Sequence, residues 1–256
     1  MIESVNNNLH QLSQWFLANR LSLNYIKSET MILCRKIIYF PLPPIKIDNN
    51  PIPYNHSVKF LGLIIDSKLK WQNHINFVRA KLSSACGIMF QIRNRISVSI
   101  AKIIYYTIAY PYMNYCSNVW SSAHVTYFQS LLTTQRKLIR LILKKGRRTE
   151  TTVLFKQLKL LKFQDLLKVN ALLFVYKSVH NLIHSPFHFQ ERYVQAYNLR
   201  VRHLLQLPNH TSNQSERFIY IRGIRLWNEI PENIKNSQSI FTFKRKLKKY
   251  YIDMYN

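Results

Sequence analysis

Apolar residues near the start of the chain recur at the spacing of a helix. Val5, Leu9, Leu12 and Phe16 are separated by three or four residues, which places them on one helix face. We therefore predict an amphipathic helix that runs to about Ala18.

Residues 28–66 follow a different pattern, in which short apolar and β-branched runs alternate with turn residues. The runs are Thr30–Cys34, Ile37–Phe40, Ile45–Ile47 and Val58–Ile65. Prolines and the turn sequence Asp48–Asn50 separate them, and β-branched and aromatic residues favour strands. The pattern predicts one small sheet, in which the first two runs are a strand and its return.

After Trp71 the helical spacing returns and continues through most of the chain. Predicted helices cover Ile75–Ile92, two short segments between Ile100 and Trp120 divided at Pro111, Val125–Ile142 with an end near Gly146, Leu166–Val179 stopped by Ser185 and Pro186, and Ile240–Tyr250. Residues 185–216 lack a sustained period and are predicted to be irregular. The fold class predicted is α+β, a small antiparallel sheet followed by a mostly α-helical region.

The charge of the chain is strongly unbalanced. Thirty-seven Lys and Arg face eleven Asp and Glu, which gives a net charge of +26 at pH 7. Such a chain repels itself unless an anionic partner supplies counter-charge, and nucleic acid is the leading partner. The alternative is that the charge only keeps a helical protein in solution.

Neither a membrane span nor a disulfide framework is predicted. The longest apolar stretches, such as Ile103–Met113, fall far short of the ~20 residues that cross a bilayer. The first residues lack the basic start and apolar block of a secretory signal, which favours an intracellular protein, nuclear or cytoplasmic. Three widely spaced cysteines, Cys34, Cys86 and Cys116, favour reduced and buried thiols.

Two segments carry the first motifs of a recognisable series. Trp15–Ser28 reads WFLANRLSLNYIKS, and Val58–Asp66 reads VKFLGLIID. The first resembles motif D, W-x-x-x-N-x-L-x-L-N-x-x-K-[ST], in the reverse transcriptases of LINE-type, jockey-like retrotransposons. The second resembles the primer-grip strand of that family, where the chain enters the thumb.

Further motifs follow in the order of the same family. They are Tyr105, Pro111, Tyr115 and Trp120 of the thumb, the Q-x-K-x-x-R helix at Gln135–Arg140, the G-x-x-L-W-N-x-L-P element at Arg222–Pro231, and the terminal F-K-x-x-L helix at Phe243–Lys248. Six motifs in one order make a chance match improbable. The resemblance implies the end of a palm in residues 1–70, a helical thumb in 71–150 and a helical C-terminal domain in 151–256.

The resemblance also implies magnesium chemistry that these residues do not contain. Enzymes of the family hold two Mg²⁺ ions on an early palm aspartate and on an Asp-Asp pair before motif D, and Met1 falls after both. None of the eleven acids here is adjacent to another, so no two-metal site can be built. We expect no cofactor and no polymerase activity in this chain alone. Whether Met1 is a natural start or the edge of a truncated element is left open.

Three groups of site residues follow from the motifs and from the charge. Lys27 matches the motif D lysine that gives a proton to pyrophosphate, a role expected to persist only as a relic. By resemblance, Phe60, Leu61 and Gly62 place backbone against the primer, although a plain core strand with a glycine bulge is the alternative. The predicted nucleic-acid contacts are Arg136, Lys137, Arg140, Lys144, Lys145, Arg147, Arg148, Lys244, Arg245 and Lys248.

Within the first basic cluster, Arg136, Arg140 and Lys144 stand four residues apart and are expected to share one exposed helix face. A basic helix end that complements the helix dipole is the alternative interpretation. The second cluster, at Lys244–Lys249, is equally consistent with a nuclear-import signal or a solvated face. No zinc site is predicted at His180, His184 and His188, because Pro186 breaks the helix between the last two.

The function predicted is binding of RNA and DNA backbone by a reverse-transcriptase remnant. A separate palm-containing polypeptide is a further candidate partner, and the oligomeric state is left open. Two alternatives stay open, a helical interaction module domesticated from such an element and an unselected fragment. Binding that is indifferent to salt would favour the interaction module.

Overall fold

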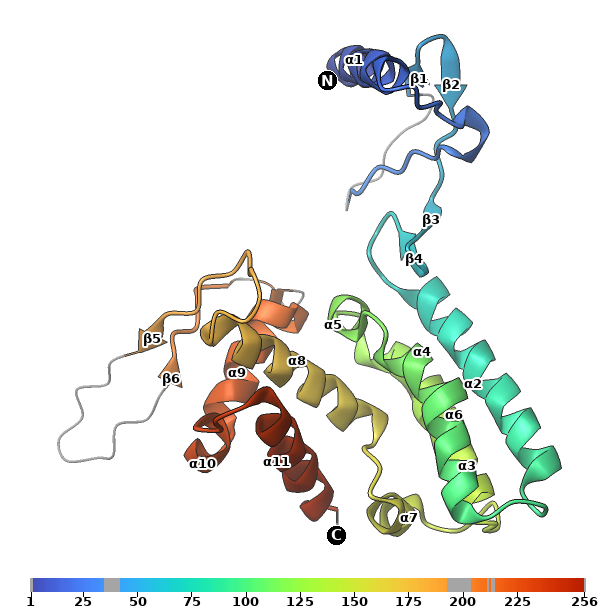
Figure 1. Cartoon of the computed structure of the whole chain (residues 1–256), viewed down its shortest axis with the longest axis vertical. Helices are drawn as coiled ribbons and strands as arrows, with labels where there is room; N and C mark the ends of the chain where they lie inside the picture. The colour runs from blue at the N-terminus through green and yellow to red at the C-terminus, as the bar shows by residue number, and fades with distance from the viewer. Residues whose placement is uncertain (1, 35–41, 193–203, 211, 213–214, 256) are drawn as a thin grey trace. The chain divides into compact units, whose positions relative to one another are not determined.

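The computed structural model describes residues 2–34, 42–192, 204–210, 212 and 215–255. The chain divides into two compact units, residues 1–74 and 75–256. Helices dominate, and the described strands pair as three antiparallel two-stranded sheets, so the predicted α+β class is confirmed (Figure 1). The boundary between a thumb and a C-terminal domain near residue 150 stays a prediction.

The first unit combines one helix with two small hairpins. Helix α1 (Ile2–Ala18) ends at the predicted residue and is followed by the 3₁₀ turn η1 (Tyr25–Lys27). The hairpins pair β1 (Ile45–Ile47) with β2 (Asn50–Ile52) and β3 (Ser57–Phe60) with β4 (Leu63–Asp66).

The single sheet predicted over residues 28–66 is wrong. The two hairpins share no ladder, and Thr30 forms only an isolated bridge with Tyr54. The predicted strand Ile37–Phe40 lies outside the described residues. Prolines explain part of the difference, because Pro51 and Pro53 lack the N–H group that a continuous ladder requires.

Asp48 fastens α1 to the β1–β2 hairpin. It lies in the hairpin turn with a φ of 53°. Its carboxylate accepts a hydrogen bond of 2.7 Å from the Ser13 hydroxyl, and His10 Nδ1 lies 2.9 Å from the other carboxylate oxygen. The hydrogen bonds from Ser13 and His10 lower the pKa of Asp48. The turn residue predicted from the sequence therefore also anchors the helix.

The described part of the second unit is mostly helical and contains one short hairpin, β5 (Glu191–Arg192) with β6 (Leu204–Leu205). Its helices are α2 (Gln72–Ile92, which begins in the first unit), α3 (Val98–Ile104), α4 (Tyr110–Asn114), α5 (Ser117–Trp120), α6 (Gln129–Ile142), α7 (Thr151–Leu158), α8 (Phe163–Val179), α9 (Ile219–Glu229), α10 (Glu232–Lys235) and α11 (Ile240–Asp253), joined in part by the turns η2 (Tyr105–Ala109), η3 (Val125–Phe128) and η4 (Ser215–Arg217). The helices predicted at α2, α6, α8 and α11 are confirmed.

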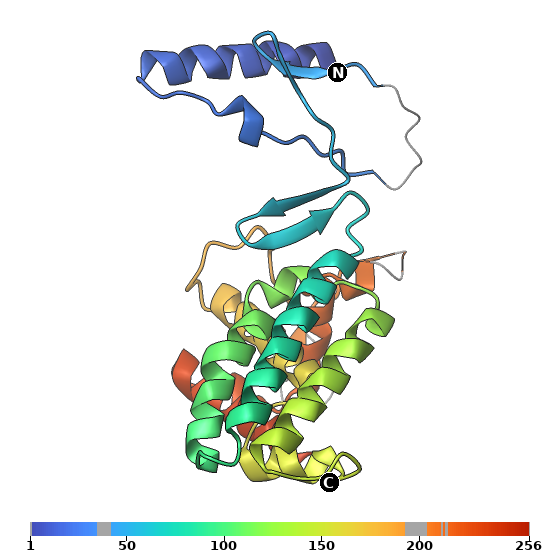
Figure 2. The same cartoon turned by 90° about the vertical axis from the view of Figure 1, so that its right-hand side faces the viewer.

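Helix α8 runs through the middle of this unit. Five of its buried residues are three positions apart, namely Phe163, Leu166, Val169, Leu172 and Val175. At this spacing they do not share one face but are spread around the helix. A helix that is apolar on every side must be covered on every side. Helices α4, α5 and α6 contact it from one direction, and α9 and α11 from another (Figure 1 and Figure 2).

The sequence predicts a helix break at Pro111, but the break lies five residues later, at Cys116. Turn η2 is a π turn, in which the Tyr110 N–H group donates to the Tyr105 carbonyl. Pro111 follows in the first turn of α4, where its missing N–H group is tolerated. The chain turns instead at Cys116, whose φ is 46°. Cys116 is exposed and Cys34 is half-buried, so the prediction of buried thiols holds only for Cys86.

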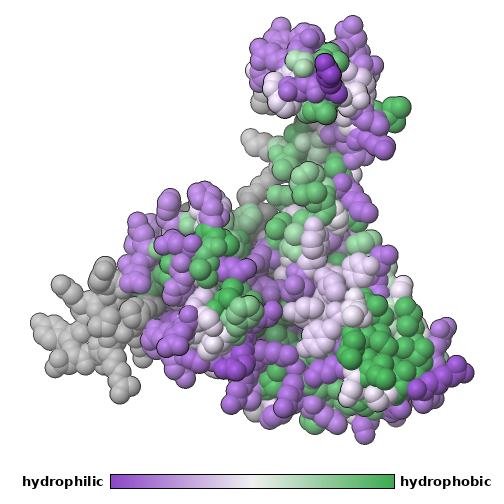
Figure 3. Space-filling model, viewed as in Figure 1, coloured by the Kyte–Doolittle hydropathy of each residue, from purple (hydrophilic) through white to green (hydrophobic). Residues whose placement is uncertain are grey.

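Some apolar side chains remain exposed on the second unit. Ile88 of α2 and Ile100 and Ile103 of α3 are 46%, 48% and 62% exposed. An apolar area gathers at the lower right of the surface in Figure 3, on the helical unit. Among the described residues, no helix combines the length and the apolar composition that crossing a bilayer demands.

The buried amide of Gln135 joins three parts of the helical unit. This side chain of α6 is 1% exposed. Its Nε2 donates to the Tyr105 hydroxyl at 3.0 Å and to the Leu161 carbonyl at 3.1 Å, and its Oε1 accepts from the Phe163 N–H group at 2.9 Å. The amide therefore holds η2, α6 and the first residue of α8 together, with its donors and its acceptor all used.

We predict that Gln135→Leu lowers the free energy of unfolding of the helical unit by about 2–4 kcal/mol. The substitution keeps a side chain of similar size but leaves buried donors and acceptors on Tyr105, Leu161 and Phe163 without partners. Urea denaturation followed by circular dichroism measures the change. Gln129→Leu, on the exposed face of the same helix, is the control and should shift the midpoint little. Equal effects of the two substitutions would contradict the prediction.

Candidate nucleic-acid interface

A basic groove lies between α2 and α6 in the helical unit. It has a volume of about 590 Å³. Five cations line it, namely Arg93 directly after α2, Lys137 and Arg140 of α6, and Lys145 and Arg147 of the turn that follows α6. No acidic residue is among the described residues that line the groove. The five cations repel one another, and no charge within the groove compensates this repulsion. The groove is therefore a candidate site for an anion.

The end of α6 determines which cations reach the groove. Leu143 caps the helix, and Lys144 adopts a φ of 54°, the left-handed conformation usual at this position. The Lys145 N–H group then donates to the Arg140 carbonyl at 2.9 Å, and the Lys144 N–H group donates to the Leu141 carbonyl at 3.2 Å. This pair of hydrogen bonds is a Schellman motif, which reverses the chain and returns Lys145 and Arg147 to the groove.

The predicted exposed stripe of Arg136, Arg140 and Lys144 is therefore wrong. Lys144 lies beyond the helix, so its four-residue spacing from Arg140 no longer gives a shared face. Arg140 is only half-exposed, and its Nε donates to the Thr149 carbonyl at 2.8 Å. Arg136, Lys144 and Arg148 are exposed but do not line the groove. Of the first predicted cluster, the structure brings together Lys137, Arg140, Lys145 and Arg147.

Helix α2 contributes residues that were not predicted as a binding site. Arg93 stacks over the Phe90 ring, with its guanidinium carbon 4.5 Å from the ring centroid. Phe90 is 60% exposed, so the groove has an aromatic surface beside its charges. The predicted helix ends at Ile92, one residue before Arg93, and no sequence signal indicated that α6 would lie next to it.

A buried thiol forms part of the groove wall. Cys86 is 2% exposed, and its Sγ lies 3.7 Å from the Thr134 carbonyl of α6. Burial raises the pKa of the Cys86 thiol to about 11. The thiol is therefore neutral at pH 7 and joins α2 to α6 as a small apolar residue rather than as a nucleophile.

The second predicted cluster, on α11, contributes no residue to the groove. Lys244 lines a separate pocket with Asn114, Asn118 and Asn170, and Arg245 is exposed. Lys248 is engaged with Tyr106, because its Nζ donates to the hydroxyl at 3.2 Å and lies 5.7 Å from the ring centroid. Burial lowers the pKa of Lys248. This lysine is half-buried and packs against Tyr106 of the helical unit.

Of the three residues that resemble a primer grip, Leu61 and Gly62 form a turn, and Phe60 is the last residue of strand β3. Val58–Ile65 was predicted as one β-prone run, but Leu61 and Gly62 are the two loop residues between β3 and β4. Their φ values of 46° and 85° are those of a type I′ hairpin turn, which needs both residues in the left-handed region. Phe60 and Leu61 are 60% and 74% exposed at its tip. A plain core strand is therefore ruled out for these residues.

Lys27 lies at the end of the turn η1. Its N–H group donates to the Asn24 side chain at 3.1 Å, and its own side chain is exposed. Among the described residues, no group of three His, Cys, Asp or Glu side chains is arranged to hold a metal ion. Asp66 has a structural role instead, because it accepts from the N–H groups of Lys68, Lys70 and Trp71.

Comparison with known proteins adds one distant relative. The chain is 25% identical over 154 residues to a probable RNA-directed DNA polymerase from transposon X-element of Drosophila melanogaster. This likeness supports the assignment of the chain to the retrotransposon reverse-transcriptase family. The matched segment covers 59% of the chain and 17% of the length of the relative. No family model and no solved structure matches the chain.

The β3–β4 hairpin allows a direct test of its turn. We predict that Leu61→Asn stabilises the β3–β4 hairpin by about 0.5–1 kcal/mol, because asparagine adopts the left-handed conformation more readily than leucine. Amide exchange in β3 and β4 should then slow by about two- to fivefold. Leu33→Asn replaces an exposed leucine outside the hairpin and should leave these amides unchanged. Faster exchange in Leu61→Asn would mean that contacts of the Leu61 side chain outweigh its backbone strain.

Proposed function

We propose that the helical unit binds the backbone of RNA and DNA through the groove between α2 and α6. The single observation that carries this proposal is the set of five cations without an acid in one groove. Phosphate groups supply the missing charge, and binding releases the counterions that otherwise surround them. Sugar-phosphate backbone is common to all sequences, so we expect weak sequence preference.

The exposed Phe90 suggests that single strands bind as well as duplexes. Its ring already stacks with Arg93, and an aromatic face beside a basic track is the combination that single-strand binders use. Thr133 and Thr134 line the same groove, and their hydroxyls donate to backbone carbonyls of α6, which leaves oxygen lone pairs for water or ligand.

Within a LINE-type element, we assign residues 71–150 to the thumb and the β3–β4 hairpin to the primer grip. The exposed Phe60 and Leu61 at the hairpin tip are consistent with contact to a primer or to a neighbouring segment. The distant relative, which acts on nucleic acid by its name, supports this assignment. On this proposal the chain is a carboxy-terminal remnant that keeps binding surfaces, and Lys27 has only a relic of its catalytic role.

A palm-containing reverse-transcriptase polypeptide is the protein partner that we propose for the first unit. Exposed apolar side chains are frequent there, including Leu12, Trp15, Leu17, Leu21 and Ile26, which is 96% exposed. A surface of this kind usually lies against another protein segment. A helical interaction module without nucleic-acid binding is the second candidate function, favoured by these same side chains.

The first test of the groove removes two of its charges. We predict that Lys137→Gln with Arg147→Gln weakens binding to an unrelated duplex and to a single strand alike. Each phosphate contact contributes roughly 0.7–0.9 to the log-log salt slope, so the slope should fall by about 1.4–1.8. Anisotropy titrations across a salt series give both quantities.

Arg136→Gln with Arg148→Gln is the matched control, because these neighbours carry the same charge but lie outside the groove. The control removes equal net charge, so it should weaken binding less and change the slope by under half as much. Equal losses in the two variants would assign binding to the general charge of the chain. A slope near zero in the unmodified chain would favour the interaction module.

The second test concerns catalysis. We predict that the purified chain extends no primer on an RNA template with Mg²⁺ or Mn²⁺, because its eleven acids are dispersed along the sequence. Incorporation of labelled dNTPs, compared with a buffer control and with a complete reverse transcriptase, is the measurement. Template-dependent incorporation above the buffer level would contradict the prediction.

A further inference from the structure

A second pocket lies in the helical unit, away from the basic groove. It is formed by the segment Ser121–Phe128, by the start of α8, and by η4 with α9. Its volume of about 450 Å³ falls in the range of small-molecule sites and is several times larger than a phosphate group needs. None of its lining residues lines the groove between α2 and α6.

Arg222 is the unusual residue of this pocket. Its guanidinium donates to the Ser121 carbonyl at 3.1 Å and to the Ser121 hydroxyl at 2.7 Å, and both acceptors are neutral. Its third donor group, Nε, is buried and has no hydrogen-bond partner. Burial lowers the pKa of Arg222 to about 10, so the guanidinium is still charged at pH 7. A charge taken out of water in this way normally has an anionic partner.

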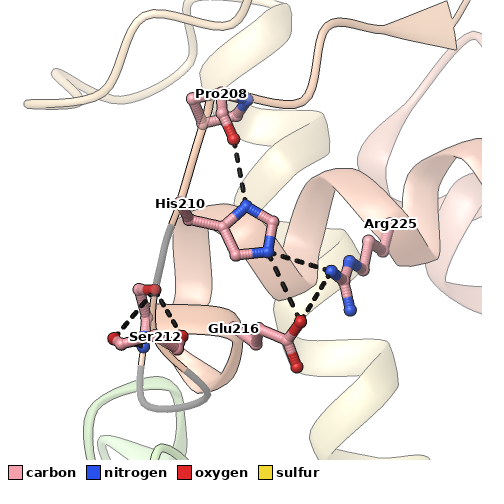
Figure 4. Close-up of polar contacts among 6 residues, drawn as sticks. Pro208, His210, Ser212, Glu216 and Arg225 are labelled. Atoms are coloured by element: carbon pink, nitrogen blue, oxygen red, sulfur yellow. Dashed lines mark hydrogen bonds and ion pairs between the residues drawn. The ribbon is translucent and has the colours of Figure 1, made fainter.

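Glu216 is the acid among the described residues that line the pocket, and it is already engaged. Glu216 accepts from Arg225 at 3.1 Å, and its carboxylate oxygen lies 3.5 Å from His210 Nε2 (Figure 4). These two contacts lower the pKa of Glu216. Lys168, another lining residue, pairs with Asp165 at 3.3 Å. Arg217 and Arg222 are thus the lining cations that no carboxylate of the described residues neutralises.

Four apolar residues form another part of the wall, beside the polar His124 and Gln164. Phe128 and Leu167 are buried, Ala123 lies beside them, and Val125 is 53% exposed at the surface. An inorganic anion alone would leave this wall in contact with water. A ligand that joins a flat apolar ring to an anionic group would cover the wall and also compensate the guanidinium groups.

We propose that this pocket binds a nucleotide, with its phosphate on Arg222 and Arg217 and its base against the apolar wall. The nucleotide can be free or part of a strand, since both present the same phosphate and base. The proposal uses no residue of the basic groove and therefore does not depend on the proposed function.

Isothermal titration calorimetry with adenosine 5′-monophosphate tests the proposal. The protein is the full chain with Lys137→Gln and Arg147→Gln, so that the basic groove does not compete with the pocket for the nucleotide. We expect one site, with adenosine and inorganic phosphate each bound at least about tenfold more weakly. A short single strand should compete for the site if the natural source is nucleic acid, and should fail to compete if it is a free nucleotide.

Two substitutions at the pocket should each weaken nucleotide binding by about tenfold. Arg217→Gln removes a phosphate donor, and Val125→Glu places a carboxylate at the mouth of the pocket, where it repels the phosphate. Both sites are at least partly exposed, so the fold should persist even if Arg222 itself cannot be replaced. The matched controls are Arg148→Gln and Val153→Glu, which lie outside the pocket and should bind within about twofold of the parent chain.

The expected pattern requires saturable binding and loss only in the two pocket variants. Absence of binding to the full chain at millimolar nucleotide would overturn the proposal, and so would undiminished binding by Val125→Glu. Adenosine bound as tightly as its monophosphate would remove the role of Arg222 and Arg217. Phosphate bound as tightly as the nucleotide would remove the role of the apolar wall.

Discussion

The position of α6 depends on one buried amide. Gln135 meets the Tyr105 hydroxyl, the Leu161 carbonyl and the Phe163 N–H group in a region closed to water. Because an unsatisfied group there would be costly, the three partners can meet only in one arrangement of η2, α6 and α8. The opposite face of α6 is thereby fixed toward α2, and the groove exists because that face carries Lys137 and Arg140.

The few acids of the chain serve mainly as structural anchors. Asp48 holds α1 to its hairpin, Asp66 accepts three N–H groups before α2, and Glu232 pairs with the buried Lys235 at 2.8 Å. Asp165 accepts from the Tyr255 hydroxyl as well as pairing with Lys168. Acids fixed in these places cannot neutralise the groove. Since no acid is among the described residues that line the groove, an external anion would compensate its cations, which is the physical basis of the proposed function.

Periodicity predicted the elements whose apolar residues are long and regular. Helices α1, α2, α6, α8 and α11 follow from it, whereas the short α7 and α9 do not. Two local conformations could not be predicted, because the residues that adopt them are not the usual ones. Lys144 takes the left-handed position where glycine is expected, and Leu61 takes the first position of a turn that favours asparagine or aspartate. At Leu61 the following Gly62 indicated a turn, but the β-branched residues around it favoured a continuous strand.

The Q-x-K-x-x-R motif shows how a family resemblance can carry both fold and site. On a helix of about 100° per residue, Lys137 and Arg140 lie roughly 200° and 140° from Gln135, so both point away from the core that Gln135 enters. The glutamine fixes the helix and the two cations face the groove. Tyr105 and Trp120, from another motif, are buried and serve the fold alone. Arg93, Lys145 and Arg147 belong to no motif, so the resemblance indicates where the groove begins, and only the packing of α2 and the turn at Lys144 completes it.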